Sequence, residues 1–214
     1  HAAGERIVHR SDILSLLMNT KRAVTVAGAH GKTTTSSMLA HILTHAGEGN
    51  LADPSYAIGG SIQGKDGVML DGGHAGQGDV LVAEADESDG SFAKYHPEIA
   101  IVTNSEADHL DHYGTQENYR AAFVDHVQHA VKSVVMCGDD EGNLAVLRAL
   151  DASAAAHTVV YATQDAASLG DLNGAAFVHI ESESESAQSG AEHFTLHVPA
   201  GLLGEQERMV PVTL

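Results

Sequence analysis

VTVAGAHGKTTTSSMLAHIL, residues 24–43, is the stretch from which the fold can be predicted. It opens with apolar residues, and apolar residues return at helical spacing from Met38 onward. Two glycines and a lysine separate the two apolar parts. This order predicts a strand, then a glycine-containing turn, then a helix.

The turn, residues 28–31, has the properties of an anion-binding site. Glycine at both ends allows backbone amides to converge where a Cβ atom would clash, and the N-terminus of the following helix adds partial positive charge. Lys32 adds a full charge, and Thr33 carries a hydroxyl of the kind that such loops place on Mg²⁺. We therefore expect residues 28–34 to bind polyphosphate.

The loop departs from the usual phosphate-loop pattern. GxxxxGK[ST] requires glycine at position 26, where this chain has Val26, so the loop is the shorter GxxGKTT. Asn104 could begin a guanine-reading NKxD element, but Ser105 and Ala107 occupy its lysine and aspartate positions. The loop alone thus indicates nucleotide phosphate without a reaction, and a GTPase is disfavoured.

The composition limits the classes of protein that fit. A chain of 214 residues with 43% apolar residues fits one domain with room for a small appendage. The net charge of −18 disfavours nucleic acid and anionic membranes as partners. The single cysteine, Cys137, ends an apolar run, so we expect it to be buried and unreactive. With no signal peptide and no long apolar span visible, we expect a cytoplasmic protein without membrane insertion.

Apolar runs alternate with helical patterns along the chain. We expect a leading helix that Ser11 caps, with its apolar face made by Ile13, Leu16 and Leu17. The predicted strands after the loop are 79–84, 99–103, 133–137 and 159–161, and the predicted helices are 116–131 behind Thr115 and one behind residues 139–140. This alternation predicts an α/β fold, a mostly parallel sheet covered by helices on both faces.

The pattern changes from about residue 175. Three short apolar segments follow, and the acidic, serine-rich stretch ESESESAQSGAE, residues 181–192, lies between the first two. We expect a small antiparallel appendage of two or three strands over residues 175–214, with the acidic stretch as a solvated hairpin loop.

Acidic and histidine side chains follow two of the predicted strands. Glu84 ends an apolar strand, which is where a phosphate loop needs a carboxylate to hold Mg²⁺. His109, between Asp108 and Asp111, follows the next strand, and we expect it to be a metal or phosphate ligand. Ligands of open α/β sheets gather at the carboxyl ends of strands, so these groups and the phosphate loop should meet at one edge.

Three further acids in the first of these segments leave two interpretations open. Asp86, Glu87 and Asp89 could form a solvated turn as well as part of the site.

The three motifs together resemble one family. GAHGKTTT, AEADESDGSF and TNSEADHLDHY, in this order and each after a predicted strand, resemble the central ATP-binding domain of the Mur ligases, in detail over about residues 7–150 and more loosely to Leu214. The histidine of the loop, DESDGSF and the stretch DPSYAIGG, residues 53–60, are most similar to the members that join L-alanine to UDP-N-acetylmuramate.

The resemblance implies a reaction and roles for residues. ATP phosphorylates a substrate carboxylate, an amine attacks the acyl phosphate, and phosphate leaves. Lys32 would hold the β- and γ-phosphates, Thr33 and Glu84 one Mg²⁺, and His109 a second Mg²⁺. The residues that the resemblance places at the nucleotide are Gly28, Ala29, His30, Gly31, Lys32, Thr33, Thr34 and Asn104.

The chain departs from the family pattern in two respects. Some members carry a carbamylated lysine where this chain has Phe123 and Val124, so a carbamate bridge is not expected, which fits the alanine-adding branch. The family's N-terminal UDP-sugar domain and C-terminal amino-acid domain do not fit in 214 residues, and its PGxHNxxN segment does not occur. We expect a middle domain over residues 23–214, with residues 1–22 leading in from a preceding domain and the substrates held by flanking domains.

Other interpretations of the sequence are a different Mur-type ligase and a stand-alone nucleotide-binding module used in regulation or assembly. A generic P-loop kinase is disfavoured by the short loop and by the second cluster of histidine and aspartate.

Overall fold

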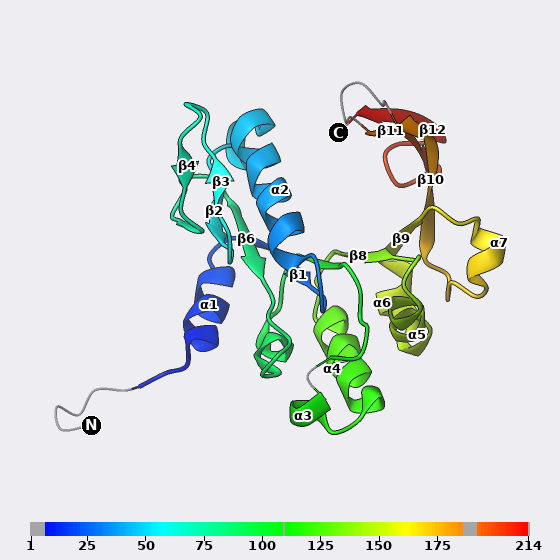
Figure 1. The fold of residues 1–214 in the computed structure, drawn as a ribbon, viewed down its shortest axis with the longest axis horizontal. Coiled ribbons are helices and arrows are strands. Elements are labelled where there is room, and N and C mark those ends of the chain that lie inside the picture. Colours follow the sequence, from blue (N-terminus) through cyan, green and yellow to red (C-terminus); the bar gives the residue numbers. More distant parts are fainter. Residues whose placement is uncertain (1–6, 109, 186–191, 214) are drawn as a thin grey trace.

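A large sheet with helices packed against it forms the body of the chain (Figure 1). The structure, a computed structural model, describes residues 7–108, 110–185 and 192–213. Within these residues one ten-stranded sheet has the order β12-β11-β10-β9-β8-β7-β1-β6-β2-β5. Its strands are β1 (Arg22–Ala27), β2 (Ser55–Ala57), β5 (Gly73–His74), β6 (Val80–Glu84), β7 (Ile99–Val102), β8 (Ser133–Cys137), β9 (Thr158–Ala162), β10 (Ala176–Glu185), β11 (Glu192–Val198) and β12 (Arg208–Thr213).

Helices and a small hairpin connect these strands. The hairpin pairs β3 (Ile62–Gln63) with β4 (Met69–Leu70) beside the helix that follows the glycine turn. The helices are α1 (Arg10–Met18), α2 (Lys32–Ala46), α3 (Leu110–Tyr113), α4 (Gln116–Gln128), α5 (Glu141–Ala149), α6 (Ala152–Ala156) and α7 (Ala166–Leu169), with the 3₁₀ turns η1 (Gly49–Leu51) and η2 (Ser91–Lys94).

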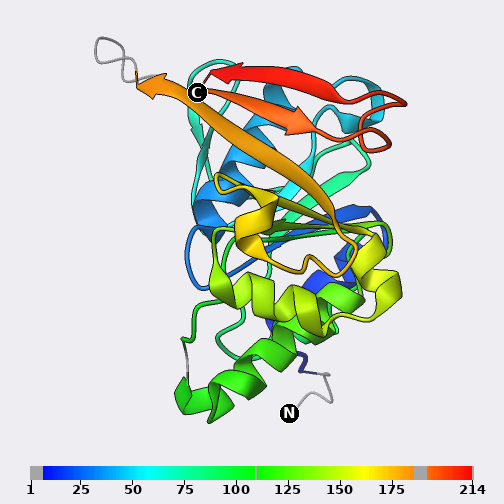
Figure 2. The ribbon, with the colours of Figure 1, turned by 90° about the vertical axis from the view of Figure 1, so that its right-hand side faces the viewer.

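Strand directions confirm the predicted mostly parallel sheet. From β2 through β6, β1, β7, β8 and β9 to β10, all neighbours pair in parallel, whereas β5, β11 and β12 are antiparallel to theirs. Because β10 pairs with β9, the C-terminal antiparallel strands continue the main sheet. Figure 2 shows β10 running past β9 to join β11 and β12 at one end of the molecule.

The acidic stretch at residues 181–192 is only partly a connection. Its first residues belong to β10, which runs to residue 185, and β11 begins at residue 192, so the prediction of a hairpin loop over the whole stretch was wrong. Residues 186–191 lie outside the described residues. Pairing with the long neighbouring strand β11 draws the acidic residues into the sheet.

Alternation along the central strands creates two apolar cores, one on each face of the sheet. Val24, Val80 and Val82 form one core with Ala40 of α2. Ala23 and the residues that alternate with these valines form the other core, whose helical members come from α1, α4, α5, α6 and α7. Helices therefore cover both faces at β1 and β6, as predicted.

Burial on both faces does not extend to β7, β8 and β9. Every second residue of these strands is only half-buried, for example Ile101, Val135 and Val159. Cys137 lies in this half-buried set, so the prediction of a buried cysteine was wrong. Burial nevertheless raises the pKa of its thiol, in keeping with the expected low reactivity.

The helix termini were predicted with mixed success. Thr115 accepts a hydrogen bond from the amide of Asn118 and caps α4, as expected, and Asp140 caps α5 in the same way. The cap of α1 is His9, not Ser11, which is buried. The apolar residues predicted on one face of α1 are exposed, namely Ile13, Leu16 and Leu17. Among the described residues, no helix combines the length and apolarity needed to cross a membrane.

Candidate functional site

Three parallel strands bring the three sequence motifs to one edge of the sheet. β1 lies between β6 and β7 and runs parallel to both, so residues 28–31, 85–90 and 103–108 all leave the sheet at the carboxyl edge. Thr103 Oγ1 donates a hydrogen bond to the carbonyl of His30 at 2.6 Å, which joins the first segment to the third. The predicted meeting of the three segments is thus present.

Glycine is required at two positions of the loop. A Cβ atom at Gly28 would lie 2.1 Å from Thr103 Oγ1, and the φ of +142° is one that other residues rarely adopt. Gly31 adopts a left-handed conformation, φ +82°, at the N-cap of α2. The loop therefore lies close against residues 103–104, and it can follow this path only because Gly28 and Gly31 have no side chain.

The N-terminus of α2 fits a phosphate group. Gly31 provides no side-chain cap, and the first amides of a helix have no partner within the helix. These amides point out of the helix end together with the positive end of its dipole. Thr34 lies in this first turn and is exposed. An uncapped helix end that follows a tight glycine turn is the geometry that binds phosphate oxygens.

Lys32 is held by an ion pair that the sequence did not reveal. Its Nζ donates to Glu87 Oε1 at 2.9 Å and to the carbonyl of Gly28 at 2.6 Å, and it lies 2.9 Å from Glu87 Oε2 as an ion pair. Glu87 is 0% exposed, so the interpretation of this residue as part of a solvated turn was wrong. Nothing in the run of acids marks Glu87 out, because burial depends on how the loop after β6 folds against α2.

The neighbouring acids have more exposed partners. Asp86 accepts a hydrogen bond from Arg10 Nη2 at 2.8 Å, on the surface beside α1. Burial raises the pKa of Asp86, but hydrogen bonds from Ser88 and Arg10 outweigh it and hold the pKa below its ordinary value. Asp89 accepts from the amide of Ser91 at 2.8 Å and so shapes the turn into η2.

Glu84 and Thr33 lie together, as the magnesium prediction requires. Thr33 Oγ1 donates to Glu84 Oε2 at 3.2 Å. Glu84 Oε1 accepts from Ser36 Oγ at 3.2 Å and from the amide of Gly59 at 2.6 Å. A Cβ atom at Gly60 would lie 2.7 Å from Thr33 Cγ2, so the two glycines after β2 pack closely over this pair.

The side chains at this position suit Mg²⁺ better than a metal ion that takes all of its ligands from the protein. Within the described ranges no group of three or more histidine, cysteine or acidic side chains could hold a metal ion. Magnesium binds through one or two carboxylates, with water and phosphate oxygens completing its octahedron. The carboxylate of Glu84 and the hydroxyl of Thr33, beside the N-terminus of α2, match this coordination.

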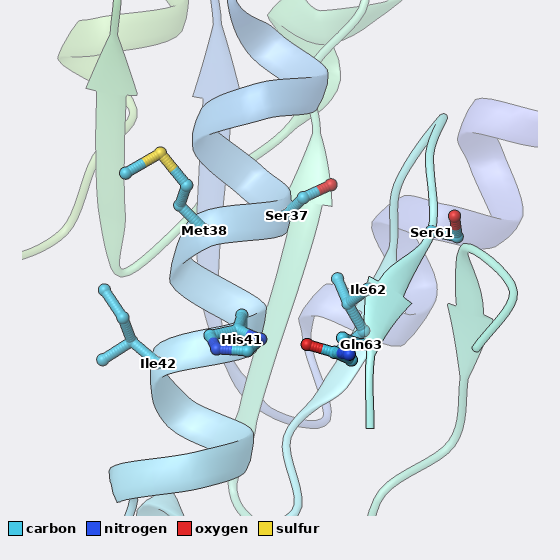
Figure 3. A pocket seen from close by; sticks show the side chains of 7 residues that line it. All are labelled: Ser37, Met38, His41, Ile42, Ser61, Ile62 and Gln63. Atoms are coloured by element: carbon cyan, nitrogen blue, oxygen red, sulfur yellow. The ribbon is translucent and has the colours of Figure 1, made fainter. Parts of the chain in front are cut away.

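A cavity of about 790 Å³ opens in front of this group. Lys32 and Glu84 line it. The other polar or glycine residues at its wall are Arg10, Asp86, Gly59, Gly72 and Gly73. A second, more apolar groove lies between α2 and the segment around β3 (Figure 3). Its lining residues are Ser37, Met38, His41, Ile42, Ser61, Ile62 and Gln63, which do not include the charged groups of the first cavity.

His30 contributes to this geometry through its backbone. The side chain of His30 is exposed, and the contacts of this residue with Asn104 are made by its backbone. His109, predicted to bind the second metal ion, lies outside the described residues.

Known proteins that resemble this chain are Mur ligases. The family model described as the Mur ligase middle domain matches residues 26–207. UDP-N-acetylmuramate--L-alanine ligase of Bifidobacterium adolescentis is 82% identical over the whole chain, and the enzyme of the same name from Bifidobacterium longum is 69% identical over 94% of it. The chain spans 41% and 39% of the lengths of these two relatives.

Solved structures show the same fold. A UDP-N-acetylmuramate:L-alanyl-gamma-D-glutamyl-meso-diaminopimelate ligase from Neisseria meningitides matches 96% of this chain and 60% of its own, with a TM-score of 0.66 and 20% identity. A MurF ligase from Thermotoga maritima, solved in complex with ADP, matches 97% of this chain and 45% of its own, with a TM-score of 0.56 and 16% identity.

Proposed function

Since the chain belongs to the Mur ligase middle domain family, we propose that it is the ATP-binding domain of a cytoplasmic ligase that joins L-alanine to UDP-N-acetylmuramate. The 82% identity to a ligase of that name over the whole chain carries the substrate assignment. Residues 23–214 form the ATP-binding domain, and the parts of the intact protein outside this chain hold the UDP-sugar and the amino acid.

ATP places its phosphates on the loop of residues 28–34. Support comes from the uncapped end of α2 and from Gly28, where any side chain would meet Thr103. Lys32 neutralises charge on the phosphates, and the amides at the start of α2 hold their oxygens. Asn104 fixes the backbone of His30, so the loop keeps its shape while the phosphates bind.

Mg²⁺ is held by Thr33 and Glu84. Ser36 and the amide of Gly59 orient the carboxylate of Glu84 from the other side. When bound, Mg²⁺ neutralises the phosphate oxygens and so lets an anionic acceptor approach. His109 contributes a second metal ligand, as the family resemblance implies.

The acceptor carboxylate enters the large cavity in front of Lys32 and Glu84. Arg10 adds positive charge on one side of this cavity. The carboxylate takes the terminal phosphoryl group of ATP, and the amine of L-alanine then displaces phosphate. Charge stabilisation around the transferred phosphoryl group is the main contribution that these side chains make.

Binding and turnover test this proposal. Calorimetric titration of the intact protein with ATP and Mg²⁺ should show binding that Lys32→Ala abolishes. In the same protein Lys32→Ala and His109→Ala should each lower ligation by orders of magnitude, since each removes charge stabilisation. Near-normal turnover in either variant would contradict the role given to that residue.

A further inference from the structure

We propose that Glu87 is a positioning residue that holds the Lys32 ammonium group inside the loop and competes with the incoming polyphosphate for it. The inference rests on the proposed nucleotide site. It concerns a residue for which the sequence left two interpretations, and it gives the buried ion pair a role in binding.

Lys32 Nζ donates hydrogen bonds to Glu87 Oε1 and to the carbonyl of Gly28, and its charge is paired with both carboxylate oxygens of Glu87. An ammonium group has three N–H donors. Nζ lies 2.9 Å from each carboxylate oxygen of Glu87 and 2.6 Å from the carbonyl oxygen of Gly28. Phosphate oxygens that approach Lys32 therefore compete with Glu87 for the charge of the ammonium group.

The segment that carries Glu87 is held in place. The backbone carbonyl of Glu87 accepts a hydrogen bond from the amide of Gly90 at 3.0 Å and another from the hydroxyl of Tyr113. Burial, and next the charge of Glu87, raise the pKa of Tyr113 to about 12, so this hydroxyl keeps its proton and its role as donor. The carboxylate is thus presented to Lys32 from an anchored turn.

Burial makes the competition strong. The Glu87 side chain is 0% exposed and that of Lys32 is 18% exposed, so water screens their attraction poorly. A ligand that draws the ammonium group away leaves a carboxylate with less compensation in a buried place. The exchange is favourable only for a ligand that carries several negative charges. Glu87 therefore favours a polyphosphate over a single phosphate group.

Removing the charge of Glu87 should strengthen polyphosphate binding. In Glu87→Gln the ammonium group of Lys32 loses its buried counter-charge, and a bound anion supplies a negative charge in its place. With inorganic tripolyphosphate and Mg²⁺ as the probe, calorimetry on the intact protein should show binding about tenfold tighter than in the unaltered protein. Orthophosphate should gain by a larger factor than tripolyphosphate, because the competition from Glu87 disfavours a single phosphate group more.

Two comparisons separate this role from a general change in charge. Asp89→Asn removes one negative charge from the same segment, at a side chain that bonds the amide of Ser91 and leaves the Lys32 contacts intact, so tripolyphosphate affinity should change by no more than about twofold. In a Lys32→Met background, Glu87→Gln should also change affinity by less than about twofold, because the competing partner is gone.

Stability gives an independent measurement. Without ligand, Glu87→Gln should lower the melting temperature, and saturating tripolyphosphate should raise it by more than in the unaltered protein. A purely structural role for Glu87 predicts the lower melting temperature without ligand but not the larger rise with tripolyphosphate. If Glu87→Gln does not fold, Glu87→Asp serves instead: its shorter side chain reaches Lys32 less well, so affinity should rise about threefold.

The outcomes distinguish this inference from the proposed function. The inference is overturned if the unaltered protein binds tripolyphosphate and the folded variants Glu87→Gln and Glu87→Asp bind it no more tightly. That result leaves the proposed nucleotide site intact. Failure of every variant and of the unaltered protein to bind tripolyphosphate or ATP contradicts the proposed function, and the inference with it.

Discussion

The backbone of His30 and the side chain of Asn104 are joined by two reciprocal hydrogen bonds. The amide of His30 donates to Asn104 Oδ1 at 3.0 Å, and Asn104 Nδ2 donates to the carbonyl of His30 at 2.9 Å. A side-chain amide offers both a donor and an acceptor, so asparagine satisfies both groups at once. The phosphate loop is thereby fixed to the segment that follows β7.

Asn104→Asp should therefore impair nucleotide use more than folding. The variant keeps the acceptor, loses the donor and adds a negative charge next to the proposed phosphate site. We expect kcat/KM for ATP in the intact protein to fall by roughly 10- to 100-fold, with a melting temperature within a few degrees of the original. Asn118→Asp is the matched control. Asn118 lies at the start of α4, and its exposed side-chain amide donates to the carbonyl of Tyr113. Equal effects of the two variants would contradict the role of Asn104.

Gly28→Ala should distort the loop. Its Cβ atom would lie 2.1 Å from Thr103 Oγ1 in a backbone conformation with φ +142°. We expect loss of detectable ATP binding by calorimetry and a stability cost of roughly 2 kcal/mol or more by denaturant unfolding. Gly174→Ala is the control, since Gly174, between α7 and β10, also has a positive φ, +81°, but a Cβ atom there would meet no other described part of the chain within 4 Å. Normal ATP binding by Gly28→Ala would show that the loop does not need glycine there.

Glu84→Gln should change the response to magnesium. The amide keeps the size of the side chain but removes the charge that a hard cation requires. We expect the Mg²⁺ concentration for half-maximal activity to rise at least about tenfold. Glu98→Gln, which removes an acid paired with Arg22 at the opposite end of the strands, should leave this concentration unchanged. An unaltered magnesium response in Glu84→Gln would exclude Glu84 as a ligand.

His126 should make the fold sensitive to mild acid. Burial lowers the pKa of His126 from 6.5 to about 4, and its ring nitrogens meet the carbonyl of Phe92 and the hydroxyl of Thr25. Above pH 6.5 the imidazole is neutral in both states, so it adds no pH dependence. Between pH 6.5 and 4 the unfolded chain takes up a proton that the folded chain excludes, which lowers the free energy of unfolding by roughly 3 kcal/mol.

Urea unfolding at several pH values measures this effect. His126→Gln should flatten the decline between pH 6.5 and 4 relative to the unaltered protein, whereas His45→Gln, a change at an exposed histidine, should not. Parallel declines in all three proteins would mean that other groups cause the acid sensitivity.

Local signals predicted the sheet and the positions of its strands. The apolar runs of β1, β6 and β8 and the caps Thr115 and Asp140 lie where the sequence placed them, because each depends on residues close together in the chain. The exposure of Ile13, Leu16 and Leu17 on α1 was not predicted, since the spacing shows that an apolar face exists but not whether anything covers it.

The site was predicted as far as strand order allows. Parallel pairing brings the three motifs to one edge, and the position of Glu84 beside Thr33 follows from the end of β6 lying next to α2. The burial of Glu87 and the packing of Gly59 on Glu84 depend on the paths of loops, which one sequence does not specify.

Product analysis of the intact protein tests the central claim most directly. Incubated with ATP, Mg²⁺, UDP-N-acetylmuramate and an equal mixture of L-alanine, glycine and a diamino acid, it should form the L-alanine conjugate by mass spectrometry, with one ADP and one phosphate per conjugate. Lys32→Ala should form essentially none. A conjugate made mainly with another amino acid would contradict the substrate assignment, and ATP hydrolysis without any conjugate would contradict the assignment as a ligase.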